Sequence, residues 1–99
     1  MQINKKDQNR KDLDQKNKPE AGHFIYIIEC SDGSWYTGYT TDIARRVAEH
    51  NRGEGAKYTR GRTPVKLIYQ ESFSSRSSAQ KREYEIKKLP RAKKEELLV

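Results

Sequence analysis

Short apolar runs separated by polar stretches predict three strands in this chain. Residues 24–30 (Phe-Ile-Tyr-Ile-Ile-Glu-Cys) are rich in β-branched and aromatic side chains, which is typical of a strand packed on at least one face. Residues 34–38 and 65–72 predict a second and a third strand. The dipeptide Asp32-Gly33 indicates a tight hairpin turn between the first two strands.

The segments between and after these strands predict helices. A capped helix is expected over residues 42–51, and a second over residues 74–88. Pro90 stands where a proline opens a helix, so a short final helix is expected over residues 91–98. The resulting order, β-β-α-β-α-α, favours an α+β domain with a small three-stranded antiparallel sheet flanked by helices.

Residues 1–22 differ in composition from the rest of the chain. They carry six Lys or Arg, four Asp or Glu, and only four apolar residues. Low hydrophobicity with mixed charge does not offset the entropy lost on ordering, so we expect a disordered polar tail. Residues 23–99 then form one small domain, of a size at which a single hydrophobic core is marginal.

The charge and the cysteine content narrow the class of partner. The formal net charge is +7, of which residues 23–99 contribute +5. A small basic domain favours nucleic acid as its partner, although the same charge also serves solubility. Cys30 is the only cysteine, which excludes an internal disulfide and a cysteine-based metal framework. No apolar run approaches membrane-spanning length and no signal peptide is visible, so we expect a reducing, cytoplasmic setting and no membrane partner.

The register of the hairpin decides whether Tyr26 and Tyr36 can belong to one site. A two-residue loop at Asp32-Gly33 would place Glu29 opposite Tyr36 and the two tyrosines on opposite faces of the sheet. A three-residue loop or a bulge would shift the register by one residue and bring both tyrosines to the same face. The sequence leaves both arrangements open.

Arg46 and His50 are candidate site residues of the first helix. They are four residues apart, so they lie on one helix face. They border the apolar stripe of Ile43 and Val47, from where a side chain can reach a cleft beside the core. A solvated Asp42–Arg46 ion pair with an inert histidine is the alternative interpretation.

Glu83 is the candidate metal ligand. It projects within about 40° of Ala79, inside the apolar stripe of the second helix. A carboxylate directed at the core is costly unless it is paired or binds a metal ion. A hard cation such as Mg²⁺ or Mn²⁺ suits it, and a buried salt bridge, for example to Arg45 or Arg46, is the alternative. Glu85 points away from that face, so one metal ion fits better than two.

The long loop between the first helix and the third strand is basic and punctuated by glycines. Lys57, Arg60 and Arg62 suit contacts to phosphate groups of a nucleic acid. A solvated loop without a partner is the alternative. His23 and Cys30 are interpreted as structural residues.

Taken as a spaced set, these residues resemble the GIY-YIG nuclease superfamily, in particular its small stand-alone bacterial members. The tripeptide that ends at Tyr26 stands where the family has Gly-Ile-Tyr, and the tripeptide that ends at Gly38 stands where it has Tyr-Ile-Gly. Arg46 lies eight residues after that glycine, as the family's catalytic arginine does. His50 and Glu83 match the family's histidine and metal-binding glutamate. Further similar segments are residues 50–51, 56–59 and 64–67.

The resemblance implies hydrolysis of phosphodiester bonds in DNA with one divalent metal ion, Mg²⁺ or Mn²⁺, on Glu83. Tyr26 or Tyr36 would act as general base toward the attacking water. Arg46 would neutralise charge on the phosphate in the transition state, and His50 would orient the water or a tyrosine, or assist proton transfer.

The resemblance favours DNA over RNA as the substrate, in a repair or recombination setting. A separate protein partner is a candidate source of specificity. A non-catalytic nucleic-acid-binding module that keeps the nuclease fold is the alternative function. An accessory subunit of a larger complex is a third.

Overall fold

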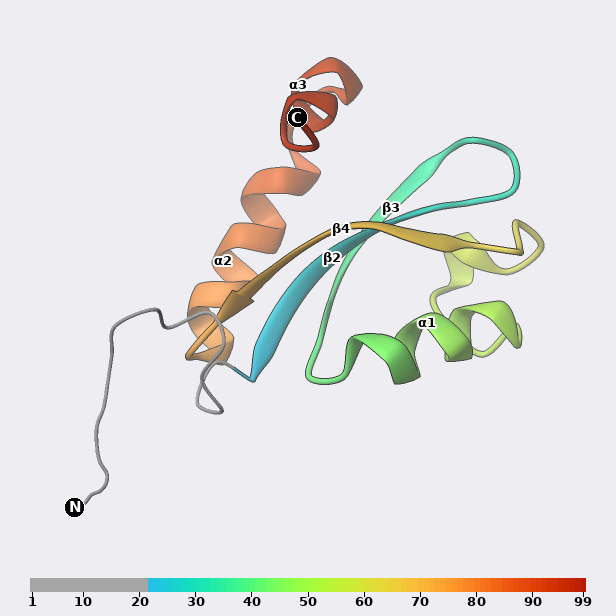
Figure 1. Ribbon diagram of the computed structural model, residues 1–99, viewed down its shortest axis with the longest axis horizontal. Coiled ribbons are helices and arrows are strands. Elements are labelled where there is room, and N and C mark those ends of the chain that lie inside the picture. The colour runs from blue at the N-terminus through green and yellow to red at the C-terminus, as the bar shows by residue number, and fades with distance from the viewer. Residues whose placement is uncertain (1–21) are drawn as a thin grey trace.

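The computed structural model describes residues 22–99, so the polar tail predicted for residues 1–22 lies outside the described residues except for Gly22. The helices and strands follow the predicted order, β-β-α-β-α-α, and the predicted α+β class is confirmed. They are β2 (His23–Glu29), β3 (Trp35–Thr40), α1 (Ile43–Asn51), the 3₁₀ turn η2 (Lys57–Thr59), β4 (Lys66–Phe73), α2 (Arg76–Lys87) and α3 (Arg91–Glu96) (Figure 1).

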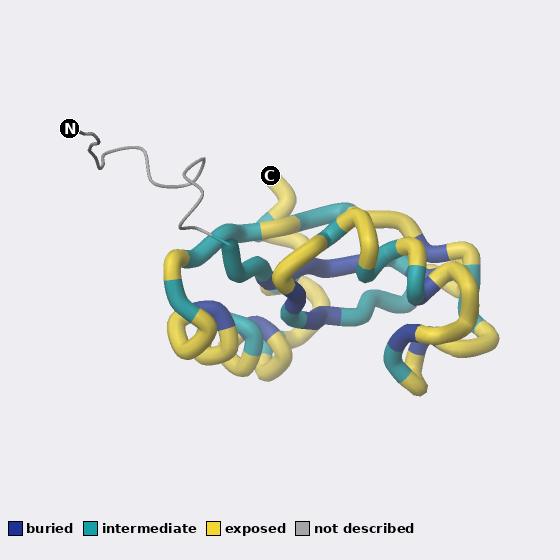
Figure 2. Tube along the Cα trace, turned by 90° about the horizontal axis from the view of Figure 1, so that it is seen from below, coloured by how far each residue is buried: buried dark blue, intermediate teal, exposed yellow. Residues whose placement is uncertain are grey.

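The three strands form one antiparallel sheet in the order β3-β2-β4, so the first strand of the chain is the central one. Because side chains alternate between the two faces of a strand, β2 serves two cores. Ile25 and Ile27 pack against Ile86 of α2 on one face. Tyr26 and Ile28 pack toward α1 on the other face. The sheet therefore lies between two helical layers, with the exposed segments on outer helix turns and loops (Figure 2).

The hairpin between β2 and β3 has a three-residue loop, residues 31–33. The Cys30 amide donates to the Ser34 carbonyl oxygen at 2.8 Å, and the Gly33 amide donates back to Cys30 at 2.9 Å. Gly33 adopts φ +85°, a left-handed conformation that favours glycine. This loop length selects the register that places Tyr26 and Tyr36 on the same face of the sheet, the one covered by α1.

Side-chain caps set where the two longer helices begin. The Asp42 carboxylate accepts a hydrogen bond from the Arg45 amide at 3.0 Å, so α1 begins one residue later than predicted. The Ser75 hydroxyl accepts from the Ser78 amide, which places the start of α2 at Arg76 rather than at residue 74. Across residues 22–99, no helix is long and apolar enough to span a membrane.

The long basic loop is tied to the body of the domain at both ends. The Asn51 side chain at the end of α1 accepts from the Val65 amide at 2.7 Å and donates to the Val65 carbonyl at 3.2 Å. The Ser31 amide of the hairpin loop donates to the Arg62 carbonyl at 2.8 Å. These contacts hold the η2 turn against the face of the sheet that carries Tyr26.

Candidate active site

Tyr26 lies on the central strand directly opposite Gly38 of β3, and that glycine makes room for its ring. A Cβ atom on Gly38 would stand 2.4 Å from the Tyr26 hydroxyl oxygen, far inside van der Waals contact. The Tyr26 ring therefore lies across the β3 backbone, where it is 1% exposed. Gly38, predicted as a structural motif residue, is the neighbour that admits the buried ring.

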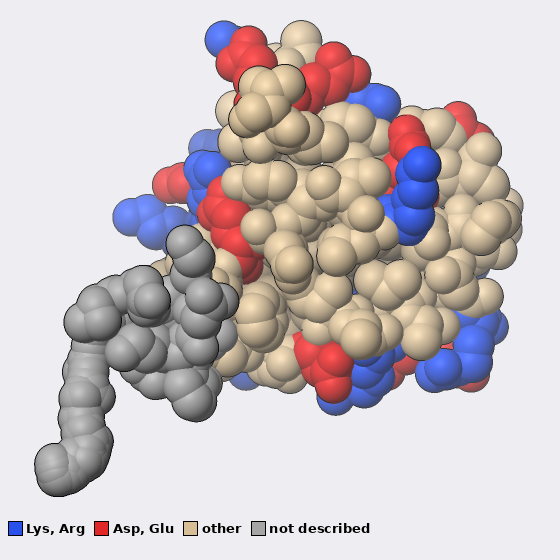
Figure 3. Space-filling view, viewed as in Figure 1, with Lys and Arg blue, Asp and Glu red and all other residues tan. Residues whose placement is uncertain are grey.

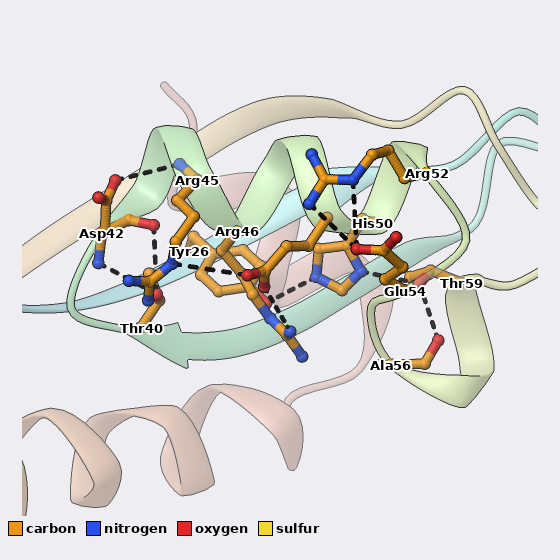
Figure 4. A network of polar contacts seen from close by, with 11 residues as sticks. Tyr26, Thr40, Asp42, Arg45, Arg46, His50, Arg52, Glu54, Ala56 and Thr59 are labelled. Atoms are coloured by element: carbon orange, nitrogen blue, oxygen red, sulfur yellow. Dashed lines mark hydrogen bonds and ion pairs between the residues drawn. The ribbon is translucent and has the colours of Figure 1, made fainter.

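A chain of three hydrogen bonds begins at the Tyr26 hydroxyl. This oxygen lies 2.8 Å from Nε2 of His50, which is completely buried. Nδ1 of the same imidazole lies 2.8 Å from Oγ1 of Thr59 in η2. The Thr59 hydroxyl donates to the Ala56 carbonyl oxygen at 2.9 Å (Figure 4).

Counting protons along this chain assigns a direction to every bond. A threonine hydroxyl has one proton, and here it goes to Ala56. Thr59 Oγ1 therefore accepts from Nδ1–H of His50, which leaves Nε2 of the neutral imidazole as an acceptor. The Tyr26 hydroxyl consequently donates its proton to His50.

The pKa shifts of the two residues agree with that assignment. Burial raises the pKa of Tyr26 to about 12, with the Arg46 guanidinium acting in the opposite direction. Burial, and after it the positive charge of Arg46, lowers the pKa of His50 below its ordinary value. At neutral pH the pair is a phenol beside a neutral imidazole.

Sequence reasoning missed two residues that hold this arrangement, Thr59 and Gly55. A Cβ atom on Gly55 would stand 2.2 Å from Nδ1 of His50, so only a glycine lets the loop close over the imidazole. The only hint in the sequence was that residues 56–59 are similar to a segment of the family. That similarity does not say what any of these residues contacts. Both contacts join a loop to a helix, so no helical or strand periodicity reveals them.

Tyr36 lies between the buried pair and the surface. Its ring centroid is 6.5 Å from that of Tyr26 and 5.6 Å from that of His50. On its other side it stacks on Tyr58 of η2, with centroids 6.0 Å apart and planes inclined by 19°. Tyr58 is 40% exposed, so the aromatic rings lead from solvent to the Tyr26 hydroxyl.

Arg46 reaches toward Tyr26 from α1. Its Nη1 donates to the Glu49 carboxylate at 2.9 Å, so the alternative of an ion pair with Asp42 is wrong. The side chain is 29% exposed, which leaves part of the guanidinium open to a ligand. Its positive charge lowers the pKa of both Tyr26 and His50.

Glu83 approaches the same phenol from α2, which packs against β3 as well as β2. Its partner Lys87 lies with Nζ 5.8 Å from the centroid of the Tyr36 ring, and the negative charge of Glu83 is the smallest of the causes that raise the pKa of Tyr26. The carboxylate pairs with Nζ of Lys87 at 3.0 Å. The alternative interpretation from the sequence, a salt bridge of Glu83, is therefore present, but its partner is Lys87. The suggested partners Arg45 and Arg46 are wrong, because Glu49 engages both arginines.

Glu83 could serve as the one protein carboxylate that binds a divalent cation, with the remaining ligands coming from water and substrate. Within residues 22–99 there is no group of three or more His, Cys, Asp or Glu side chains arranged to hold a metal ion. Mg²⁺ is commonly held by one or two carboxylates together with water and substrate phosphates. The Glu83 side chain is 19% exposed, so a cation arriving with a phosphate can reach it once Lys87 moves aside.

The three cations predicted on the loop lie outside this cluster. Lys57 and Arg60 are exposed at the two ends of η2. Arg62 is engaged, because its Nε lies 3.1 Å from the Asp32 carboxylate and its Cζ lies 4.2 Å from the centroid of the Tyr58 ring. The structure thus brings together five of the predicted site residues: Tyr26, Tyr36, Arg46, His50 and Glu83.

Comparisons with known proteins agree on one family. Residues 22–96 match the family model of the GIY-YIG catalytic domain. A UPF0213 protein of Halobacterium salinarum is 69% identical over 75 residues, which cover 76% of this chain and 97% of that protein.

Two solved structures are also similar. The solution NMR structure of the UPF0213 protein BH0048 from Bacillus halodurans is 57% identical, with a TM-score of 0.50 and coverage of 76% of this chain and 80% of the other. The solution NMR structure of the protein EF2693 from E. faecalis is 51% identical, with a TM-score of 0.53 and coverage of 75% and 79%.

Proposed function

The chain belongs to the GIY-YIG family, and on that premise we propose that it is a metal-dependent endonuclease that hydrolyses phosphodiester bonds in DNA. The GIY-YIG domain is a nuclease fold, which points to a nucleic acid as substrate. The observation that carries the proposal is the buried hydrogen bond between the Tyr26 hydroxyl and the imidazole of His50, with the guanidinium of Arg46 beside it. The Glu83–Lys87 pair of α2 borders the same cluster, because Lys87 Nζ lies 5.8 Å from the centroid of the Tyr36 ring.

The proton path through Tyr26 and His50 supports activation of a water molecule. With a pKa of about 12, only about one Tyr26 in 10⁵ is ionised at pH 7, so the free phenolate is a poor source of base. In the proposed step the water gives a proton to the Tyr26 oxygen while Tyr26 gives its own proton to Nε2 of His50. The phenol is neutral before and after the step, and the positive charge appears on the imidazole.

Arg46 stabilises the negative charge that builds up on the phosphate in the transition state. Its guanidinium is held on one side by Glu49 and open on the other, so it is oriented before the substrate arrives. Glu83 would hold the divalent ion, Mg²⁺ or Mn²⁺. That ion supplies further neutralisation of phosphate charge and a lower pKa for a bound water.

The basic charge of the domain supports binding to the phosphate backbone with little preference for sequence. Such binding is sensitive to salt, because each phosphate contact releases counterions. We assign the activity to the cytoplasm and to DNA repair or recombination, with a protein partner as the source of specificity. The single cysteine, Cys30, is free and buried, which suits a reducing compartment.

A cleavage assay on a panel of labelled nucleic acids tests this function. The panel holds duplex, single-stranded, branched and abasic DNA, and RNA, each with Mg²⁺, Mn²⁺ or EDTA. We expect cutting of at least one DNA form with Mg²⁺ or Mn²⁺ and none with EDTA. Binding of nucleic acid without cutting under every condition would contradict the proposal and favour a non-catalytic binding module. Cutting of RNA alone would refute the assignment of DNA as substrate.

A further inference from the structure

A cationic pocket lies beside the candidate active site and shares Arg46 with it. Its volume is about 350 Å³, and β2, β3, α1 and α2 all contribute to its wall. The side chains that matter for its chemistry are His23, Tyr39, Arg45, Arg46, Glu49 and Arg76. None of the loop cations predicted to contact phosphate belongs to it.

The pocket keeps a positive charge although it contains a carboxylate. Glu49 pairs with Arg46 at 2.9 Å and with Arg45 at 3.6 Å, so one negative charge holds two guanidinium groups in place. Arg76, from the first turn of α2, adds a third. The three arginines and Glu49 give the wall a formal net charge of +2. Within the described part of the chain, Arg76 forms no ion pair with an acidic side chain, and its Cζ lies 5.5 Å from the centroid of the Tyr39 ring.

The stacked rings of His23 and Tyr39 form one side of this pocket. Nδ1 of His23 lies 2.8 Å from the Tyr39 hydroxyl, and the two rings stack with centroids 6.0 Å apart and planes inclined by 14°. The Tyr39 ring is also the one that faces the guanidinium of Arg76. His23, interpreted from the sequence as structural, is part of this wall.

We propose that this arginine pocket binds a phosphate group of the nucleic-acid backbone adjacent to the phosphate that is cut. This inference rests on the proposed function. It adds a second phosphate-binding position, which cleavage of a phosphodiester bond does not by itself require. Planar guanidinium groups match the geometry of phosphate oxygens and bind them by paired hydrogen bonds. Because Arg46 borders both the pocket and the Tyr26 hydroxyl, the two phosphates lie on either side of one guanidinium.

The distribution of charge favours this pocket over the face of the domain that Figure 3 shows. On the face shown in Figure 3, Lys and Arg lie mainly around the rim, next to Asp and Glu, and the centre is uncharged. On the loop, Arg62 is already neutralised by Asp32. The pocket instead presents uncompensated positive charge in a concave surface beside the reacting group.

Binding in EDTA tests the pocket without any requirement for cleavage. The full chain is titrated with a labelled DNA duplex at several salt concentrations, as wild type, Arg76→Gln and Lys81→Gln. Lys81 is a matched control, because it is an exposed cation of the same helix, about 140° around the axis from Arg76. We expect Arg76→Gln to weaken binding several-fold and to lower the slope of log K against log salt by about 0.9, the value for one phosphate contact.

The possible results distinguish failure of the pocket proposal from failure of the nuclease proposal. Equal effects of Arg76→Gln and Lys81→Gln would overturn the pocket and leave the nuclease proposal standing. No binding of DNA or RNA by the wild-type chain at low salt would overturn both.

A second measurement locates the phosphate. The DNA form that is cut at one defined position is prepared with one neutral methylphosphonate at successive positions and is bound to wild type and to Arg76→Gln in EDTA. We expect one position where neutralisation weakens wild-type binding but leaves the Arg76→Gln complex unchanged, next to the cleaved bond. Equal losses in both proteins at every position would contradict the pocket.

Discussion

The hydroxyl of Tyr26 lies 2.8 Å from Nε2 of His50, and the proton between them belongs to the tyrosine. This direction follows from Thr59, whose own proton is donated to a backbone carbonyl, so that it accepts from the other nitrogen of the imidazole. Proximity alone would allow either direction. Thr59 therefore fixes the tautomer of His50, and this tautomer sets the direction of proton transfer, from Tyr26 to His50.

Replacing Thr59 by valine is expected to disturb the tautomer of His50. The Nδ1–H group would lose its acceptor inside the domain, at a cost of about 1–3 kcal/mol of unfolding free energy. Nitrogen-15 NMR of the imidazole should show the Nδ1–H tautomer in wild type and a mixture in Thr59→Val, with Thr59→Ser restoring the wild-type spectrum. An Nε2–H tautomer in the wild-type protein would rule out the assigned direction.

The cleavage rate is expected to fall in acid as His50 becomes protonated. The imidazole must be neutral to accept a proton, and burial together with Arg46 lowers its pKa, so activity persists below pH 6.5 and is lost as the pH falls through that lowered pKa. The free energy of unfolding also decreases as the pH falls below about 6.5, because His50 then binds a proton in the unfolded chain but not in the folded one.

The contribution of Arg46 to the lowered pKa of His50 can be measured directly. Arg46→Gln removes the positive charge beside the imidazole, so an NMR titration should show a higher pKa for His50 in the variant. Arg91→Gln, on α3, removes the same charge elsewhere and should leave the titration unchanged. A His50 pKa that is the same in Arg46→Gln as in wild type would contradict the electrostatic account.

Gly38→Ala is expected to impair cleavage by displacing the Tyr26 ring. The new Cβ atom would stand 2.4 Å from the hydroxyl oxygen, and relieving such overpacking typically costs about 1–3 kcal/mol of unfolding free energy. Gly33→Ala in the same hairpin meets no atom within 4 Å and strains only a turn. Urea denaturation and cleavage rates should therefore show reduced stability in both variants but lost activity only in Gly38→Ala. Wild-type cleavage by Gly38→Ala would show that the ring position is unimportant.

Lys87→Met is expected to tighten the binding of Mn²⁺ to the free protein. The Lys87 ammonium lies 3.0 Å from the Glu83 carboxylate, so a cation must displace it. Lys88→Met is the matched control, because Lys88 lies over the Tyr84 ring instead. Titration of Mn²⁺ followed by electron paramagnetic resonance should give a lower Kd for Lys87→Met alone. Equal affinities in the two variants would argue against Glu83 as the metal ligand.

The elements of the fold were predictable because each carries its own local pattern. The apolar run that became β2, the Asp-Gly turn and the Asp and Ser caps all lie within a few residues of the structure they form. The common face of Tyr26 and Tyr36 was not predictable, because one residue more or less in the hairpin loop reverses it.

The partners of the charged groups were the least predictable part. Glu83 pairs four residues along its own helix, with Lys87, and not with an arginine of α1 as the sequence analysis allowed. The roles of Gly55 and Thr59 depend on how the loop closes over His50, and no periodicity encodes that closure. The arginine pocket likewise joins the beginning of α2 to α1 and two strands, which only the tertiary structure shows.

The most direct test of the account is single-turnover cleavage by Tyr26→Phe beside Tyr84→Phe. Each variant loses one phenolic oxygen, but Tyr26 is buried against His50 whereas Tyr84 is 63% exposed on α2. We expect Tyr26→Phe to bind DNA like wild type and to cut it slower by about 10²–10⁴-fold, the contribution of a positioned proton-transfer group. Tyr84→Phe should cut at the wild-type rate. Wild-type cleavage by Tyr26→Phe would contradict the central claim that the Tyr26 hydroxyl carries the proton.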